Sequence, residues 1–272
     1  MAIKRYLPKY QYDFDAQGEV TIRLPDEDLA GFNTSLLNIG RLNAPSVGTV
    51  VLAVMLDLEG FTKFVNPRDP QNRLALFICD FYEWLFERIR ESLVGPIDLC
   101  AELPFFSKFL GDGVLLLWNA DGTRLASGAK DSQVSGEENA QTMVCNVIAC
   151  MLSILEDYED FRQALSHKTG ASVPERLRCG VAKGMVFSIG GGNDYVGPCI
   201  NISARLEKFR TLPFACAADG INLKYFHPEY QSKLVRKKVD IRGINDAELI
   251  YLRQSDFDQM SPAERKEYRD PV

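Results

Sequence analysis

The sequence lacks the features that mark several large classes of protein. No stretch approaches the about 18–20 consecutive apolar residues of a membrane span, and the N-terminus has no apolar core of the kind found in signal peptides. An excess of basic residues is also missing, since the formal net charge is −6. Nucleic-acid-binding proteins usually show a basic footprint, so this charge argues against a nucleic-acid partner. We therefore expect a cytoplasmic protein with no direct membrane insertion.

The cysteines show neither a disulfide pattern nor a metal-binding pattern. There are seven of them, an odd number, and no two are separated by two residues. Most lie in apolar stretches, as reduced thiols do in the interior of cytosolic proteins. A chain of 272 residues, 46% hydrophobic and 25% charged, can bury a core without such cross-links. Its length suits one large domain, or a domain with an extension.

Two aspartates stand where a hydrophobic stretch meets a glycine turn. Val50–Leu56 is an unbroken apolar run of strand length, and Asp57 follows it directly, three residues before Gly60. Asp112 lies between two glycines, just before the apolar run Val114–Trp118. An apolar strand that ends in a carboxylate places that group at the rim of a sheet. Two such carboxylates side by side would form an oxygen-rich site of the kind that Mg²⁺ or Mn²⁺ prefers.

These two segments, together with a third, resemble the class III nucleotidyl cyclases, the family of adenylate and guanylate cyclase catalytic domains. The family pattern has an Asp shortly before Gly-Phe-Thr and a Gly-Asp about fifty residues later, and here the two aspartates are 55 positions apart. The third segment carries Asp194, Gly197, Asn201 and Arg205, with the family's spacing. The resemblance covers residues 49–252.

Apolar periodicity and turn residues predict an α+β fold with a mixed, largely antiparallel sheet flanked by helices. The expected strands are 50–56, 105–110, 114–118, 177–181, 185–189, 214–218, 238–242 and 249–252, with a short strand within 17–24. The second and third of these, and the fourth and fifth, are expected to form hairpins. The expected helices are 73–93, 139–158 and one that begins at Pro198, where proline suits the first helical position.

Turn-forming residues and changes in composition along the chain predict three segments. Residues 1–45 are expected to be an N-terminal extension, 46–255 the nucleotidyl cyclase catalytic domain, and 256–272 a C-terminal tail. The polar segment 119–138 is expected to be a loop, and the basic run 236–238 a solvated edge.

The resemblance assigns roles to the best-matched residues. Asp57 and Asp112, with the backbone carbonyl of Leu58, would hold two divalent metal ions, Mn²⁺ or Mg²⁺. Arg205 would stabilise charge on the α-phosphate in the transition state, and Asn201 would orient the ribose. In the family these last two come from the opposite subunit. The resemblance therefore implies a head-to-tail homodimer with two shared active sites.

Other residues are expected to bind the nucleoside triphosphate. The turn that contains Phe61 and Thr62 opens toward a helix, so its N–H groups can receive phosphate oxygens. Arg242 stands about where the family often has a lysine that binds the triphosphate. The glycines at 190–192 are expected to form a hairpin turn rather than a phosphate cradle.

The base is assigned from two positions. Lys108 and Asp194 match the family positions that choose the base, and Lys with Asp is the adenylate cyclase combination; as an alternative, Lys108 would form a surface ion pair. Most class III adenylate cyclases have an aromatic residue and then Gly after that Asp, where this chain has Tyr195-Val196-Gly197. A bulky side chain, with Phe61 and Tyr195 as candidates, would fill part of a purine site and favour a pyrimidine.

A small cyclase with no input module that we recognise resembles the Pycsar-type bacterial antiphage cyclases. The resemblance implies conversion of UTP to cyclic UMP, a second messenger read by a separate cyclic-nucleotide-binding effector. The alternatives are an adenylate cyclase that makes cyclic AMP and a cytidylate cyclase that makes cyclic CMP. A degenerate domain that binds nucleotide without catalysis would lack a metal-binding Asp or the Arg, and this chain has both aspartates, Asn201 and Arg205.

Overall fold

The computed structural model describes residues 11–14, 16–18, 20–23, 30, 33–64, 71–94, 102–121, 136–169, 173–209, 212–244 and 247–271. The expected loop at 119–138 lies largely outside these residues. The chain divides into two compact units. The larger unit holds Thr49–Val186 and Gly197–Val272, and the smaller unit holds Met1–Gly48 and Phe187–Val196.

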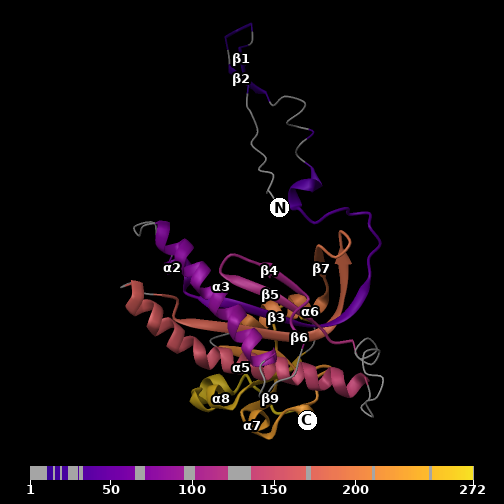
Figure 1. Cartoon of the computed structure of the whole chain (residues 1–272), viewed down its shortest axis with the longest axis vertical. Helices are drawn as coiled ribbons and strands as arrows, with labels where there is room; N and C mark the ends of the chain where they lie inside the picture. The colour runs from indigo at the N-terminus through magenta and orange to yellow at the C-terminus, as the bar shows by residue number, and fades with distance from the viewer. Residues whose placement is uncertain are drawn as a thin grey trace. The chain divides into compact units, whose positions relative to one another are not determined.

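A mixed sheet forms the centre of the larger unit, with the strand order β4-β5-β3-β6-β8-β10-β9 (Figure 1). The strands are β3 Gly48–Glu59, β4 Phe106–Phe109, β5 Gly113–Asn119, β6 Arg176–Ile189, β8 Phe214–Ala217, β9 Leu234–Val239 and β10 Glu248–Arg253. β6 and β8 run parallel, whereas β5 pairs antiparallel with β3 and β4, and β10 with β8 and β9. The expected α+β class, the mixed sheet and the hairpin that contains Asp112 are confirmed.

Two long helices, α3 and α5, pack against each other in the larger unit (Figure 1). The helices of this unit are α2 Phe61–Phe64, α3 Gln71–Val94, α5 Gly136–Thr169, α6 Pro198–Glu207, α7 Pro228–Ser232, α8 Gln254–Gln259 and α9 Pro262–Arg265, with the 3-10 turn η3 Leu223–Tyr225. Pro198 starts α6, as expected. α5 is longer than the expected helix 139–158. Its apolar stretch has the length and composition of a membrane span, but 67% of it is buried inside the protein, as in a core helix.

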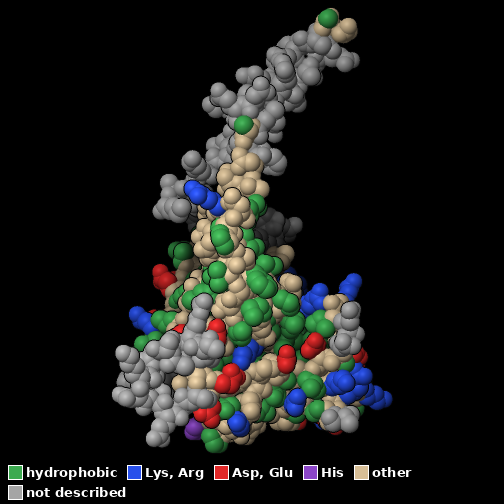
Figure 2. Space-filling model, turned by 90° about the vertical axis from the view of Figure 1, so that its right-hand side faces the viewer, with side chains coloured by type: hydrophobic (Ala, Val, Ile, Leu, Met, Phe, Trp, Pro, Cys, Tyr) green, Lys and Arg blue, Asp and Glu red, His purple; other side chains and the backbone are tan. Residues whose placement is uncertain are grey.

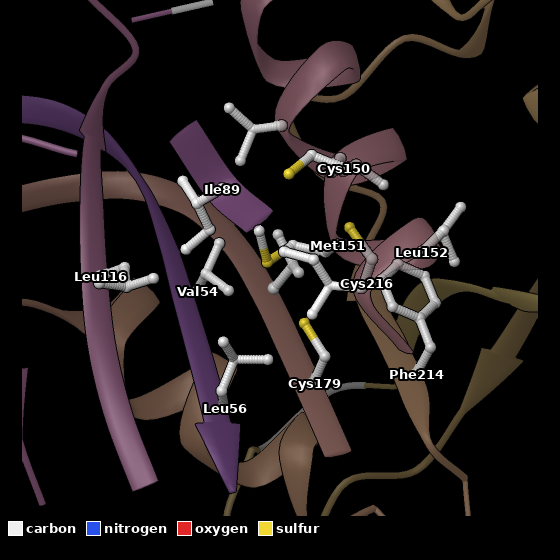
Figure 3. Close-up of a cluster of buried hydrophobic side chains, with 14 of the residues drawn as sticks. Val54, Leu56, Ile89, Leu116, Cys150, Met151, Leu152, Cys179, Phe214 and Cys216 are labelled. Carbon is white, nitrogen blue, oxygen red and sulfur yellow. The ribbon is translucent and has the colours of Figure 1, made fainter. Parts of the chain in front are cut away.

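The main core lies between the sheet and these two helices. Every second residue of β3 from Leu52 to Leu58 belongs to it. Figure 3 shows Val54 and Leu56 of β3 near Ile89 of α3 and Met151 of α5. The intervening β3 residues from Val51 to Met55 are buried as well. β3 is therefore buried on both faces, as its unbroken apolar sequence predicts.

The described cysteines are free thiols, and all of them except Cys79 are buried. Burial raises the pKa of the Cys145, Cys150, Cys179 and Cys216 thiols, so these side chains stay neutral. Figure 3 shows Cys150, Cys179 and Cys216 among the core residues. The expectation of buried thiols is confirmed for this part of the chain, and Cys100 lies outside the described residues.

The expected hairpin 177–181/185–189 is wrong, because β6 is one continuous strand of 14 residues. Its glycines, Gly180 and Gly184, do not form a turn but allow α6 to pack close to the strand. A Cβ on Gly180 would lie 2.0 Å from the Ser203 carbonyl oxygen, and one on Gly184 would lie 3.0 Å from the Cβ of Cys199. Both glycines face α6, so the helix can cross the strand at short range.

The expected strand 238–242 is also wrong in its position, since β9 covers Leu234–Val239 and residues 240–244 leave the sheet. β9 ends the strand order, as a basic edge would, but Lys237 is buried there. Its ammonium group lies 2.5 Å from an Asp270 oxygen and 4.3 Å from the ring centre of Phe257. Arg269 also pairs with Lys238 through the backbone. Residues after 255 therefore cover this edge of the larger unit.

The smaller unit contains two hairpins. β1 Gln11–Phe14 pairs antiparallel with β2 Val20–Arg23, which lies within the expected strand 17–24. β7 Asp194–Val196 pairs with the end of β6 through the turn at 190–193, as expected. After the 3-10 turn η1 Thr34–Leu37, the Val47 N–H donates to the Ser188 hydroxyl oxygen at 2.9 Å, and the Ser188 N–H donates to the Val47 carbonyl oxygen at 3.0 Å.

Candidate active site

Strand pairing brings the segments of Asp57 and Asp112 together. In the β3–β5 register Asp57 is opposite Gly113, and the Leu58 N–H donates to the Asp112 carbonyl oxygen at 3.1 Å. Residues 52, 54, 56 and 58 of β3 face the helices α3 and α5. Because side chains alternate along a strand, Asp57 points to the opposite face of the sheet. Asp57 is buried and Asp112 is half-buried.

Tyr82 on α3 fixes the turn that carries Asp112. Its hydroxyl donates to the Gly113 carbonyl oxygen at 2.9 Å. Burial raises the pKa of Tyr82, and the charges of Asp112 and Asp57 raise it further. Sequence reasoning placed this tyrosine only on a helix and gave it no role.

α6 presents the other expected catalytic residues. Its inner face is buried through Cys199, Ser203, Leu206 and Glu207. Asn201 and Arg205 are one turn apart and both exposed, on the outer face that the sequence pattern predicts.

A hollow of about 550 Å³ lies beside Arg205. Lys208 and Arg242 also line it, so three cations surround it. Asp240 is the one acidic residue among its described lining residues, and it is paired with Arg269 at 2.7 Å. The field in the hollow is therefore positive, as an anionic ligand requires. Neither Asp57 nor Asp112 is among the described residues that line this hollow.

Gly243 sets the place of the Arg205 side chain. The residue has φ of +79°, and a Cβ at this position would lie 2.9 Å from Nη1 and 3.2 Å from Cζ of Arg205. The guanidinium group is thus packed directly on the glycine. The resemblance predicts a role for Arg242 in triphosphate binding, but the contact between its neighbour Gly243 and Arg205 was not predicted from the sequence.

A second hollow of about 550 Å³ contains Arg176 and Arg253, but it has no comparable excess charge. Arg176 pairs with Glu59 at 2.9 Å, and Arg253 pairs with Asp256 at 2.7 Å. The hollow beside Arg205 is therefore the better candidate for a triphosphate.

Comparison with known proteins gives matches at the level of structure. No family model and no curated protein sequence matches the chain. A crystal structure of the guanylyl cyclase Cya2 matches with a TM-score of 0.53 and 15% identity, covering 76% of this chain and 93% of that one. The adenylyl cyclase CyaB from P. aeruginosa matches with a TM-score of 0.50 and 14% identity, covering 77% and 95%.

The chain has the fold of a class III nucleotidyl cyclase catalytic domain. A third match is the catalytic core of a rhodopsin-guanylyl cyclase with converted specificity, in complex with ATPαS, with a TM-score of 0.50, 15% identity and coverage of 76% and 98%. The fold that the sequence motifs imply is confirmed. At these identities the likeness concerns the fold.

The residues expected to choose the base lie in different units of this cyclase fold. Lys108 is exposed on β4 in the larger unit, and Asp194 opens β7 in the smaller unit. One Asp194 carboxylate oxygen accepts a hydrogen bond from the Tyr195 N–H at 2.9 Å, and the Tyr195 side chain is half-buried. The role of these residues in base selection stays a prediction.

The turn after β3 is only partly suited to phosphate. The N–H groups of Lys63 and Phe64 donate to the Gly60 carbonyl oxygen, at 3.0 and 3.1 Å, so they are already used. Phe61 is half-buried, with its ring centre 6.0 Å from that of Phe64, in an aromatic group that packs on the core. Thr62 is exposed. Contact of Phe61 and Thr62 with substrate stays a prediction.

Two charged residues beside Asp57 were missed from the sequence. Arg178 of β6 donates from Nη2 to Oδ2 of Asp57 at 2.7 Å, and the same Nη2 lies 3.5 Å from Oε1 of Glu207. Glu207 is 2% exposed. Burial raises the pKa of its carboxyl to about 8, with a further contribution from the charge of Asp57. Only the crossing of α6 over β6 brings these three side chains together.

The donor groups fit a divalent cation. Asp57, at the end of β3, and Asp112, in the adjacent β4–β5 turn, have carboxylate oxygens, and Mg²⁺ and Mn²⁺ prefer such hard ligands. Asp57 already holds a cationic group, the guanidinium of Arg178, in a buried place. The site is thus built for positive charge, and Arg178 must leave Oδ2 for an ion to bind there. Metal binding by these residues and by the Leu58 carbonyl stays a prediction.

Proposed function

We propose that this protein is a metal-dependent nucleotidyl cyclase that converts a nucleoside triphosphate to a 3′,5′-cyclic nucleotide and pyrophosphate. The observation that carries this proposal is the placement of Asp57 at the end of β3 beside the β4–β5 turn that contains Asp112, in a class III cyclase fold. The presence of Arg205 and Arg242 around one basic hollow supports it further.

Each group has a defined task in the proposed reaction. Asp57 and Asp112 would hold divalent ions, which lower the pKa of the attacking ribose hydroxyl and neutralise the triphosphate. Arg205 donates to the α-phosphate oxygens as their charge changes, and Asn201 orients the ribose for in-line attack. Arg242 and Lys208, on the wall of the same hollow, attract the polyphosphate.

We further propose that two chains complete each site. The basic hollow and the two aspartates are separate features of one chain, as expected for halves of a shared site. β4 ends the strand order, and Phe105, Phe109 and Leu110 at this edge are exposed. Figure 2 shows further hydrophobic side chains at the surface between the charged ones. An apolar strand edge of this kind is suited to a protein partner, here a second copy of the chain.

For the substrate, we propose UTP, with cyclic UMP as the product. Lys108 and Asp194 provide a donor and an acceptor for a base, and Tyr195 is the bulky residue beside the acceptor. The chain would then act in the cytoplasm as a source of second messenger in antiphage defence, read by a separate effector. Cyclic AMP and cyclic CMP are the alternative products.

The test is incubation of the full chain with each of the four nucleoside triphosphates and Mn²⁺, with the product identified by mass spectrometry. A cyclic nucleotide and pyrophosphate in equal amounts are expected, and chelation of the metal should stop their formation. Cyclic AMP from ATP alone would end the pyrimidine assignment. Absence of any cyclic product, from a chain shown to be folded and dimeric, would contradict the cyclase assignment itself.

A further inference from the structure

Three charged side chains meet at the junction of β3, β6 and α6. Arg178 is the central one, 2.7 Å from Asp57 and 3.5 Å from Glu207 through the same Nη2 atom. The side chains are 16%, 9% and 2% exposed, in that order. One cation therefore faces two acidic groups in a place that little water reaches.

The two acidic groups are satisfied unequally. Asp57 has the hydrogen bond from Arg178, whereas Oε1 of Glu207 is buried with no hydrogen-bond partner among the described residues. The Nε atom of Arg178 is likewise buried with no hydrogen-bond partner among the described residues. The other oxygen of Glu207 is 3.9 Å from Lys208, whose side chain is mostly exposed, so that contact is weak. Such buried polar atoms without partners are rare in folded proteins and call for an explanation.

Glu207 is also held firmly in its place. A Cβ on Gly180 of β6 would lie 2.3 Å from the Glu207 backbone nitrogen, which shows that helix and strand are in direct contact there. The packing of α6 on β6 therefore fixes the Glu207 backbone and Cβ. Arg178 is two residues before Gly180 on β6, and its Nη2 atom is within 3.5 Å of both carboxylates, so only a small movement of the guanidinium separates the two pairings.

We propose that Glu207 is a positioning residue that takes over Arg178 when Asp57 binds a divalent cation. With the cation on Asp57, the Arg178 guanidinium leaves Oδ2, because two positive groups repel at one carboxylate. It then donates a hydrogen bond to Oε1 of Glu207, which already lies 3.5 Å from Nη2 and has no hydrogen-bond partner among the described residues. The exchange keeps Arg178 neutralised in a buried place, where an unpaired charge is costly. This inference rests on the metal site of the proposed function.

The test measures Mn²⁺ binding to the full chain without nucleotide, by loss of the electron paramagnetic resonance signal of free Mn²⁺. Glu207→Gln keeps the size of the side chain and removes the carboxylate. We expect it to weaken Mn²⁺ binding about tenfold or more, because the displaced Arg178 then lacks a partner. Arg178→Met should strengthen binding. In the Arg178→Met background, Glu207→Gln should have a much smaller effect, because no guanidinium needs a new partner.

Glu59→Gln is the matched control, since Glu59 also lies near Arg178 but is paired with Arg176. It should weaken Mn²⁺ binding far less than Glu207→Gln. Equal weakening by the two variants, or an equal effect of Glu207→Gln in both backgrounds, would overturn the proposal in favour of a general charge effect. Weaker binding in Arg178→Met would overturn it as well.

Failure of the metal site itself would look different. If the wild-type chain binds no Mn²⁺, or if Asp57→Asn binds it as well as wild type, the metal assignment of the proposed function is wrong. If binding depends on Asp57 but not on Glu207, only the exchange is wrong. Thermal melting of each variant shows whether it is folded, and Glu207→Asp, which keeps the charge but shortens its reach, replaces Glu207→Gln if that variant does not fold.

Discussion

Gly243→Ala should affect both stability and catalysis, because Gly243 is the surface on which Arg205 rests. Its φ of +79° lies in the left-handed region, where a Cβ costs roughly 1–2 kcal/mol. The new methyl group would also lie 2.9 Å from Nη1 of Arg205. The guanidinium has to move away, and a displacement of about 1 Å at a catalytic group can cost on the order of 10²-fold in rate.

We therefore expect Gly243→Ala to lower the free energy of unfolding by roughly 1–2 kcal/mol and kcat by about 10- to 100-fold. Unfolding by urea gives the first quantity, and cyclic product formation at saturating substrate gives the second. The loss of rate should remain below that of Arg205→Ala, since the displaced arginine keeps its charge.

Gly191→Ala is the control that separates backbone strain from the contact with Arg205. Gly191 has nearly the same φ, +77°, but a Cβ there would meet nothing within 4 Å. It should show a similar loss of stability with no loss of kcat. If Gly243→Ala and Gly191→Ala have the same kcat, the argument that Gly243 positions Arg205 is refuted.

Four further predictions concern the site. Asp57→Ala and Asp112→Ala should abolish turnover and leave the circular dichroism spectrum native, and residual product above background would contradict their metal role. Arg205→Ala should raise the barrier by about 2.7–4 kcal/mol, measured from kcat, because one preorganised donor is lost. Mixing Asp57→Ala chains with Arg205→Ala chains should restore activity, since a heterodimer has one intact site; no rescue would count against shared sites. Tyr82→Phe should lower stability by about 1–3 kcal/mol, measured by urea unfolding, because the buried Gly113 carbonyl loses its donor; unchanged stability would show that the bond does not hold the turn.

Local patterns were enough to place the parts of the fold that are set by neighbouring residues. The apolar run before Asp57 predicts a strand buried on both faces, and the glycines around Asp112 predict the β4–β5 hairpin; both are confirmed. Pro198 at the start of α6 is confirmed for the same reason, because a fixed φ and a missing N–H suit the first helical position.

Glycines within a strand were harder to interpret. Residues 177–189 were expected to form a hairpin, whereas in the structure they belong to one unbroken strand, in which Gly180 and Gly184 leave room for α6. Whether a glycine marks a turn or a close contact depends on the element that packs against it, and that element is distant in the sequence.

The sequence by itself determined the cyclase-type motifs, the apolar strands and the amphipathic helices, since these depend on the order of residues within a few turns or one strand. Tertiary structure alone decided the surroundings of Asp57. Arg178 is 121 residues away from it in the chain, and Glu207 is on the helix α6. No local pattern relates such residues, because the ion pair exists only after β3, β6 and α6 have packed and excluded water from the junction.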